Sequence, residues 1–228
     1  MENHLEIIQK SYDKGIDFGK NGINLYENLP DYIINDPDFS KWQLGYENSG
    51  SEDKSIKNYL LPSSNMKFID LGCCLKLMLK GYDKWESEYY GIDISSKTIE
   101  LLNEFVKRND LKIGSLYCGS IDKIPFENNF FDIGECIGIF EYFGKEYLIN
   151  VIKEIHRVMK PDGKFILDIP NIGNPACRIM RLIEEYLERP SEYNLLTNEF
   201  EKIIEKYFEI INKDIGNEMI MYYLKCSK

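Results

Sequence analysis

The chain has 228 residues, of which 43% are hydrophobic and 29% are charged. A soluble chain of this size buries a core without disulfide or metal staples, so a folded domain is expected. The formal net charge of −10 and the absence of a dense Lys/Arg cluster argue against a nucleic-acid partner.

The cysteine pattern and the hydropathy bear on metal binding and on the cellular compartment of the protein. The six cysteines include no C-x-x-C pair, and Cys73 and Cys74 are adjacent, which is a poor spacing for chelating one metal ion. The chain has only two histidines, so we do not expect a metal site. Cys118 and Cys136 lie in apolar segments and are expected to be reduced core residues. No segment has the length of a membrane span or the pattern of a signal peptide, so we expect a cytoplasmic protein without a membrane partner.

The first 62 residues differ from the rest in composition. Residues 4–26 predict one or two short helices, and residues 29–54 are rich in Asp, Asn, Pro, Gly and aromatic residues, which is typical of an irregular segment. Residues 54–62 predict a short helix that ends at Pro62. We therefore expect residues 1–62 to form a helical and irregular lid over an α/β domain of residues 63–228.

From Lys67 onwards, apolar strand-like runs alternate with amphipathic helices. The predicted helices cover residues 98–109, 145–160, 176–189 and 198–207, and Ser95 or Ser96 is a candidate cap for the first of them. The predicted strands cover residues 67–71, 89–94, 112–118, 130–137, 164–170, 208–215 and 218–226. This order predicts a doubly wound, mostly parallel seven-stranded sheet whose last strand is antiparallel and lies at the edge.

In such a sheet, ligands bind beyond the carboxyl ends of the strands, where Asp70, Gly72 and Asp93 are expected to meet. Asp93 follows an apolar strand, and its carboxylate can accept hydrogen bonds from both hydroxyls of a ribose. The same position also suits a carboxylate that caps the next helix. Both roles are open on the residues alone.

Four motifs together resemble the class I methyltransferases that use S-adenosylmethionine (SAM), a Rossmann-like family. They are FIDLGC at 68–73, YYGIDIS at 89–95, GSIDKIPFENNFFDIGECIGIFEYF at 119–143 and IKEIHRVMKPDGKFILDIPN at 152–171. The resemblance implies SAM as the cofactor, S-adenosylhomocysteine (SAH) as the product, and methyl transfer to a small-molecule acceptor.

The resemblance also implies roles for individual residues. Asp70, Gly72, Cys73 and Cys74 correspond to the loop at the methionine end of SAM, and Asp93 to the ribose ligand. The remaining positions implied to bind the cofactor are Ile94, Ser120 and Ile121 near the adenine and Cys136 on the floor of the site.

Three positions depart from the family pattern. Cys74 and Lys76 replace the second and third glycines of the loop, and Ser120 replaces an aspartate. Lys76 could obstruct the pocket or pair with the carboxylate of SAM. An alternative interpretation is therefore a catalytically inactive methyltransferase-like binding or scaffold protein. A dinucleotide-dependent oxidoreductase is disfavoured, because the loop has only Gly72 of the G-x-G-x-x-G pattern.

The methyl-transfer chemistry needs little from the protein beyond proximity, exclusion of water and sometimes a general base. Glu141 and Tyr142 follow the fourth strand and are the candidates, although a packed Tyr142 and a solvated Glu141 are the favoured interpretation. Four aromatic residues of the first segment are candidates for a lid over the acceptor, with ordinary core packing as the alternative: Tyr12, Phe18, Trp42 and Tyr46.

Overall fold

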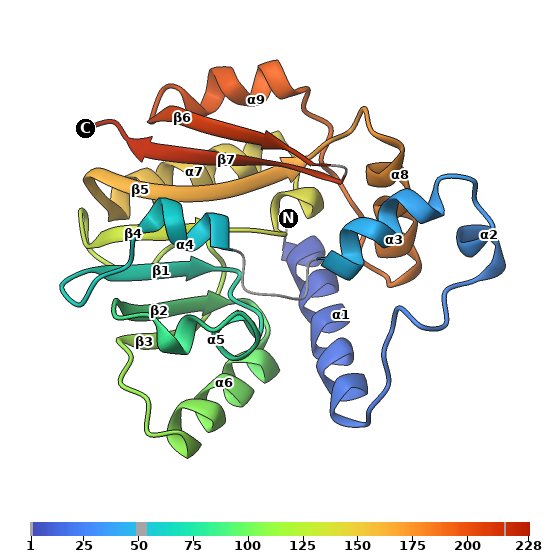
Figure 1. The fold of residues 1–228 in the computed structure, drawn as a ribbon, viewed down its shortest axis with the longest axis horizontal. Coiled ribbons are helices and arrows are strands. Elements are labelled where there is room, and N and C mark those ends of the chain that lie inside the picture. Colours follow the sequence, from blue (N-terminus) through green and yellow to red (C-terminus); the bar gives the residue numbers. More distant parts are fainter. Residues whose placement is uncertain (1, 49–53, 217) are drawn as a thin grey trace.

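The computed structural model describes residues 2–48, 54–216 and 218–228, and its centre is a seven-stranded sheet (Figure 1). The strand order is β3-β2-β1-β4-β5-β7-β6, and β7 is antiparallel to both of its neighbours. The strands are β1 (Lys67–Leu71), β2 (Glu88–Asp93), β3 (Ser115–Cys118), β4 (Phe131–Cys136), β5 (Met159–Pro170), β6 (Phe208–Ile215) and β7 (Met219–Cys226). This confirms the predicted doubly wound fold.

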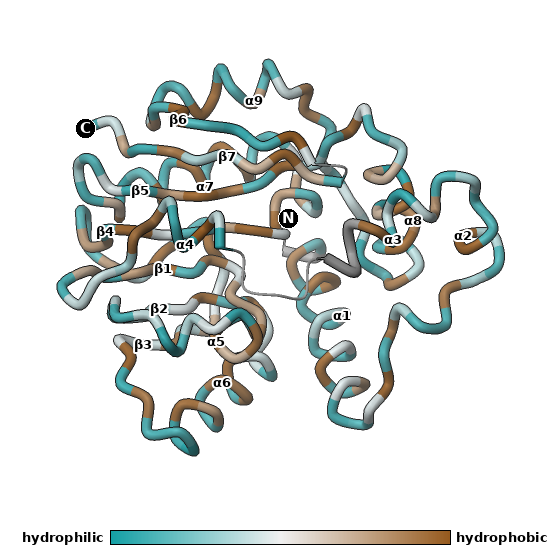
Figure 2. Tube along the Cα trace, in the orientation of Figure 1, coloured by the Kyte–Doolittle hydropathy of each residue, from teal (hydrophilic) through white to brown (hydrophobic). Residues whose placement is uncertain are grey.

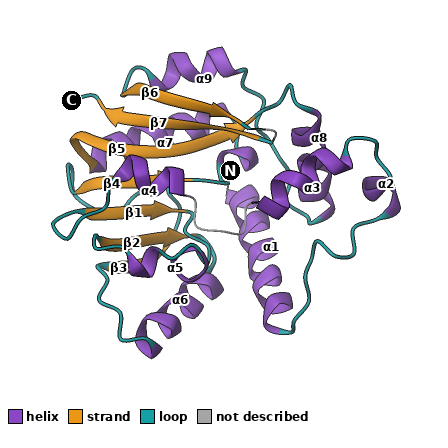
Figure 3. Cartoon of the chain, viewed as in Figure 1, coloured by secondary structure: helices purple, strands orange, loops and turns teal. Residues whose placement is uncertain are grey.

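Helices cover both faces of the sheet (Figure 3). The helices within the α/β region are α4 (Lys54–Leu60), α5 (Lys76–Leu79), α6 (Ser96–Arg108), α7 (Lys145–Val158), α8 (Pro175–Tyr186) and α9 (Thr197–Ile204), with 3-10 turns η1 (Tyr82–Lys84) and η2 (Phe140–Tyr142). The cap predicted for α6 is present, because the Ser95 hydroxyl accepts a hydrogen bond from the Thr98 backbone N–H at 3.0 Å.

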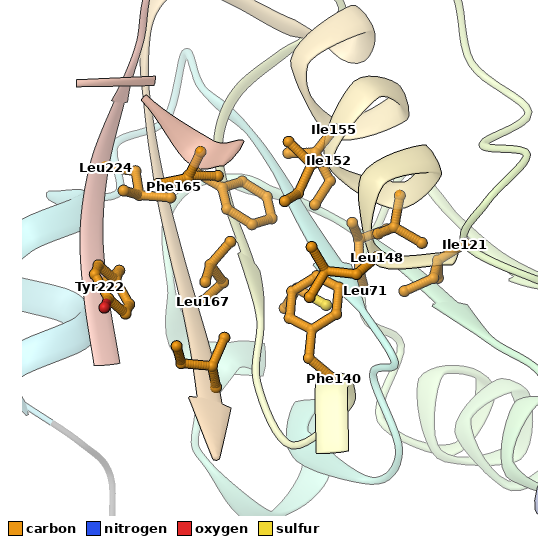
Figure 4. Packing of buried hydrophobic residues seen from close by; sticks show 14 of the residues in the cluster. Leu71, Ile121, Phe140, Leu148, Ile152, Ile155, Phe165, Leu167, Tyr222 and Leu224 are labelled. Carbon is orange, nitrogen blue, oxygen red and sulfur yellow. The ribbon is translucent and has the colours of Figure 1, made fainter. Parts of the chain in front are cut away.

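Alternation along the strands divides the core into two layers. On one face, Leu148, Ile152 and Ile155 of α7 pack against Phe165 and Leu167 of β5 (Figure 4). On the other face, α4, α5 and α6 cover a second cluster that contains Phe68, Tyr89, Ile133 and Ile166 of the sheet. In Figure 2 the tube is brown along much of β5, which lies inside the sheet.

Three details of the sheet differ from the sequence predictions. The antiparallel strand β7 is not at the edge, because it pairs with both β5 and β6 and leaves β6 outermost. Strand β5 begins at Met159 rather than at residue 164, because pairing with β4 continues on both sides of a turn at Asp162, where φ is 60°. Cys118 is exposed at the end of the edge strand β3, so its predicted burial is wrong.

The first segment is more regular than predicted. It contains one long helix, α1 (Glu2–Lys20), and the shorter helices α2 (Asp31–Ile34) and α3 (Phe39–Asn48). Residues 49–53 lie outside the described part of the chain. Helix α1 lies beyond the carboxyl ends of β1 and β2, while α3 packs on α8 (Figure 1). The irregular segment predicted for residues 29–54 is therefore partly helical.

The aromatic residues of this segment have different positions. Trp42 is only 7% exposed and packs between Phe39 and Tyr26 in a cluster with α8. Trp42 is thus a core residue, as the packing alternative predicted. Phe18 is half-buried, and the side chain of Tyr46 is outside the described part of the structure. Of these four candidates, Tyr12 faces the cavity described below.

None of the helices within residues 2–48, 54–216 and 218–228 combines the length and apolar character needed to cross a membrane.

Replacing Trp42 by Ala is expected to lower the free energy of unfolding by about 3–5 kcal/mol, because it leaves a cavity between α3 and α8. Leu44→Ala on the same helix is the control, since Leu44 is 61% exposed and its loss is expected to cost less than about 0.5 kcal/mol. Urea unfolding measures both values. Equal stability of the two variants would show that α3 is not part of the cooperative unit.

Candidate functional site

A cavity of about 550 Å³ lies at the carboxyl edge of the sheet, between the strand ends and helix α1. The strand side contributes the loops that follow β1, β2, β3 and β4. The opposite side consists largely of apolar residues from the first segment, including Leu5, Ile8, Tyr12, Ile16 and Leu25. The cavity is therefore formed jointly by the predicted α/β domain and the predicted lid.

The loop after β1 turns sharply under this cavity. Gly72 has a φ of 66°, and a Cβ at that position would come within 2.1 Å of Cδ1 of Ile139. Cys74 also has a positive φ of 44°, which is unusual for a residue with a side chain. The backbone N–H groups of Gly72 and Cys73 both donate to the carbonyl of Ile92, at 2.8 and 3.0 Å. The end of β2 thus holds the start of the loop.

Asp93 at the end of β2 connects two loops. Its Oδ2 accepts a hydrogen bond from the Cys74 N–H and its Oδ1 from the Ser95 N–H, both at 2.8 Å. Burial raises the pKa of this carboxyl, while the two N–H donors act in the opposite direction. Asp93 lines the cavity, so its remaining lone pairs are available to a ligand.

Helix α1 is attached to the same region by polar contacts. The Ser95 hydroxyl donates to Asp13 at 2.5 Å, and Lys97 forms an ion pair with Asp17. The cap of α6 therefore contacts Asp93 through its backbone and α1 through its side chain.

Lys76 at the start of α5 makes the most unusual contacts. Its Nζ lies 2.7 Å from Oδ1 of Asp70 and 2.9 Å from Oε1 of Glu135, and both carboxylates are fully buried. Asp70 and Glu135 are directly paired in register on the parallel strands β1 and β4. One ammonium is thus shared by two neighbouring carboxylates.

Two tyrosines complete this cluster. The Tyr89 hydroxyl donates to Oδ2 of Asp70 and the Tyr82 hydroxyl to Oε2 of Glu135, each at 2.8 Å. Burial raises the pKa of Asp70 to about 7, against the pull of Lys76. Burial lowers the pKa of Lys76, but the two carboxylates outweigh it and hold that pKa well above its usual value.

The other end of the cavity contains a second polar cluster, centred on Tyr142. Its hydroxyl donates to Oε2 of Glu184 at 2.9 Å and lies 3.0 Å from the hydroxyl of Tyr12. The guanidinium of Arg189 lies 4.2 Å from the centre of the Tyr12 ring, contacts Glu184 at 3.4 Å and donates to Ser11 at 3.0 Å. These contacts join α1, η2 and α8.

Glu141 and Asp168 are two further buried carboxyls near this end. Burial and the neighbouring Asp168 raise the pKa of Glu141 well above its usual value. Asp168 accepts a hydrogen bond from the Gly138 N–H at 2.9 Å, and burial raises its pKa to about 7.

The residues predicted from the sequence fall into two groups. Those that line the cavity are Gly72, Cys74, Asp93, Ile94, Ser120, Ile121, Glu141 and Tyr142. Asp70, Cys73 and Cys136 are fully buried and are not among the lining residues, so they support the site from beneath. The Ser120 hydroxyl lies 2.9 Å from that of Tyr147, whereas Asp122 does not line the cavity.

Lys76 lines the cavity, and its position bears on both roles considered for it. Its ammonium pairs with Asp70 and Glu135, which accounts for two of its three N–H donors. Sequence reasoning also missed Arg189, Glu184 and Tyr147. A glutamate at position 135 within an apolar strand was the available signal for a buried cation.

Comparisons with known proteins agree with this geometry. Residues 69–167 match a family described as "Methyltransferase domain". A sterol 4-C-methyltransferase of Caenorhabditis elegans is 30% identical over 46% of this chain and 31% of that protein. A demethylmenaquinone methyltransferase of Geobacillus sp. (strain WCH70) is 35% identical over 35% of this chain and 33% of that protein. The match thus spans about a third of these relatives.

Among solved structures, a magnesium protoporphyrin IX methyltransferase from Synechocystis PCC 6803 with bound SAH has a TM-score of 0.68. The alignment covers 98% of this chain and 100% of that protein at 13% identity, which shows a shared fold. Residues 69–167 are thus similar to a methyltransferase domain, in agreement with the four motifs, and the structural likeness shows a shared fold.

Replacing Lys76 by Met is expected to lower the free energy of unfolding by about 3–5 kcal/mol, because two buried carboxylates lose their counter-ion. Adding Glu135→Gln to this variant is expected to restore part of that loss, since one of the buried charges is then removed. Urea unfolding is the measurement, with exposed Lys107→Met on α6 as the control. No rescue by the second substitution would contradict a shared ammonium.

The raised pKa of Asp168 predicts a dependence of stability on pH. Between pH 5 and 7 the folded state holds a proton that the unfolded state, with an ordinary carboxyl pKa of 3.8, has released. Stability therefore falls as the pH rises, by about 2 kcal/mol for this one group. Asp168→Asn is expected to remove that part of the slope in urea unfolding at the two pH values.

The control for this experiment is Glu146→Gln, which removes an exposed carboxyl near the start of α7 and is expected to leave the slope unchanged. Parallel pH profiles for the wild type and Asp168→Asn would mean that Asp168 is already ionised in the folded protein at pH 5.

Proposed function

We propose that the protein transfers a methyl group from SAM to a small-molecule acceptor. The observation that carries the proposal is the position of Asp93. Its carboxylate lies at the end of β2 and lines a cavity inside a methyltransferase domain. Ligands of doubly wound sheets bind at this edge, close to the point where the strand order reverses around β1.

The ribose of SAM is assigned to Asp93. A carboxylate offers about four lone-pair positions, of which the N–H groups of Cys74 and Ser95 take two. Two hydroxyls of a ribose can use the others. The two N–H donors also fix the orientation of the carboxylate before the cofactor arrives, which reduces the entropic cost of binding.

The residues beside Asp93 in the cavity wall indicate where the adenine and the methionine end of SAM would bind. Ile94 and Ile121 offer apolar surface for an adenine, with the hydroxyl of Ser120 at its edge. The backbone of Gly72 and Cys74 is assigned to the methionine end, where the positive φ angles bring the chain close to the cavity. Asp70, Cys73 and Cys136 act from beneath, by holding this loop and the end of β4.

SAM supplies an already activated methyl group, so the protein has to align the acceptor and exclude water. The apolar side chains of α1 and the 23–26 segment, which line the cavity, serve the second purpose. Residues 1–62 are accordingly proposed as the lid segment and residues 63–228 as the methyltransferase unit. Within the lid segment, α1 and residues 23–26 line the cavity, whereas α4 packs on the sheet.

The acceptor is assigned to the end of the cavity near Tyr12, Glu141 and Tyr142. Glu141 and Tyr142 follow β4, whereas the residues assigned to the adenine follow β2 and β3, on the other side of β1. A volume of about 550 Å³ suits a small molecule together with the cofactor. The six free cysteines are consistent with a protein of the cytoplasm, where thiols remain reduced.

Titration with SAH by calorimetry tests the proposal, and saturable binding is expected. Asp93→Asn should weaken that binding at least tenfold, because a charge-assisted hydrogen bond to the ribose is replaced by a neutral one. Asp122→Asn is the control, since Asp122 follows β3 and does not line the cavity, and it should bind SAH as tightly as the wild type.

Absence of heat at high SAH concentration would favour the alternative of an inactive methyltransferase-like protein. The ion pairs of Lys76 with Asp70 and Glu135 indicate a structural role for this side chain, which removes one reason for that alternative.

A further inference from the structure

The guanidinium of Arg189 has hydrogen-bonding capacity that the protein does not use. Its Nε donates to the hydroxyl of Ser11 at 3.0 Å, and its NH1 contacts Glu184 at 3.4 Å. Within residues 2–48, 54–216 and 218–228, its NH2 donates no hydrogen bond. Arg189 lines the cavity and is only 5% exposed, so two N–H donors of a largely buried cation remain for a partner there.

Gly15 of α1 indicates where NH2 of Arg189 lies. Both residues line the cavity, and a Cβ added to Gly15 would lie 3.4 Å from this nitrogen. NH2 is not among the fully buried side-chain atoms that lack a partner, so it retains contact with open space. Because Gly15 has no side chain to cover it, NH2 can be approached from the α1 side of the cavity.

The face of the guanidinium is occupied, whereas part of its edge is not. The face of the group lies over the ring of Tyr12, with 4.2 Å between its central carbon and the ring centre. Stacking on a ring leaves the N–H bonds in the guanidinium plane free for acceptors. Tyr12 and Gly15 are three residues apart on α1 and therefore share one face of the helix, which is the face that lines the cavity.

The described part of the chain compensates the charge of Arg189 only loosely. Close pairs of a cation and a carboxylate have N···O distances of about 2.7–2.9 Å. Lys76 makes two such contacts, at 2.7 Å to Asp70 and 2.9 Å to Glu135. Arg189 has one described carboxylate, Glu184, at 3.4 Å. A second carboxylate on Arg189 would repeat the arrangement that this protein uses around Lys76.

The other acids at this end of the cavity do not exclude an anion. Burial raises the pKa of Glu141 well above its usual value and that of Asp168 to about 7, so a proton neutralises Glu141 at neutral pH. Glu184 already has Arg189 and the hydroxyl of Tyr142 as partners. The sulfonium of SAM adds a positive charge to the site when the cofactor is bound.

We infer that the methyl acceptor carries a carboxylate that binds NH2 of Arg189. This inference rests on the proposed methyl transfer and specifies the class of its substrate. A carboxylate supplies the negative charge and the in-plane acceptors that the edge of a guanidinium binds best. Leu5, Ile8 and Ile16 of the cavity wall suit an apolar or aromatic body attached to that carboxylate.

The test uses the full chain saturated with SAH, so that the cofactor site is filled before the acceptor site is probed. Calorimetry at neutral pH compares phenylacetate with phenylacetamide, and indole-3-acetate with indole-3-acetamide, as pairs of similar shape that differ in charge. The wild type is expected to bind at least one of these carboxylates about tenfold or more tightly than the matching amide, since charge-assisted hydrogen bonds are the strong ones.

Arg189→Gln removes the charge and should reduce the preference for the carboxylate to about onefold. Lys14→Gln is the control, because it removes an exposed positive charge of α1 that pairs with Glu188 and does not line the cavity. This control should keep the preference. Thermal unfolding of both variants verifies that they are folded.

Gly15→Ala tests the same contact with Arg189 intact. Alanine favours a helix, and its Cβ makes no contact shorter than 3.4 Å, so the fold is expected to be retained. The methyl group takes part of the space beside NH2 and should reduce the preference for the carboxylate by about threefold or more. Gly19→Ala on the same helix is the control, since a Cβ there meets nothing within 4 Å.

Three results would overturn the inference: no carboxylate binds more tightly than its amide, the preference survives in Arg189→Gln, or Gly15→Ala leaves it unchanged. The methionine end of SAM is a second source of a carboxylate, and 5′-methylthioadenosine, which lacks that end, separates the two sources. Equal effects of Arg189→Gln on SAH and on 5′-methylthioadenosine are expected. A larger loss for SAH would assign Arg189 to the cofactor and contradict the inference.

Failure of SAH itself to bind to the wild type would instead reject the proposed function. The two failures are therefore distinguishable, because the inference is tested only on protein that has bound SAH.

Discussion

The buried ammonium of Lys76 is the interaction on which the loop after β1 depends. Two carboxylates, Asp70 and Glu135, lie side by side on adjacent parallel strands, where mutual repulsion and loss of hydration would oppose folding. The lysine offsets both, and it comes from the first residue of α5, directly after the loop. Closing this ion pair therefore fixes the path of the chain between Gly72 and Lys76. The side chain that replaces a family glycine has a structural function here.

Asp93 connects the loop after β1 to the neighbouring loop after β2. It binds the Cys74 and Ser95 N–H groups, and Ser95 in turn donates to Asp13 of α1. A single chain of contacts thus runs from the sheet through the loop to the lid. A cofactor that used the free lone pairs of Asp93 would act on both ends of this chain, because the same carboxylate holds the loop and the cap of α6. The contacts therefore predict that ligand binding at Asp93 and the position of α1 are coupled.

Much of this was accessible from the sequence, because the apolar runs of the strands and the order of the motifs depend on local pattern. Asp93, Ser120 and Ile121 were located correctly at the strand ends for that reason. The direction of Lys76 was not accessible, since it depends on the register that places Asp70 beside Glu135. Likewise, Trp42 became a core residue only because α8, more than a hundred positions later, supplies the opposing surface.

The two acidic clusters of the cavity solve the same electrostatic problem differently. Beneath the loop, the protein provides its own cation, and every oxygen of Asp70 and Glu135 has a charged or hydrogen-bonding partner. At the other end, Glu184 has Arg189, but Glu141 has no cation within the described chain. Three buried acids thus have a cation within the protein, whereas burial and the neighbouring carboxyls raise the pKa of Glu141, so that a proton rather than a cation removes its charge.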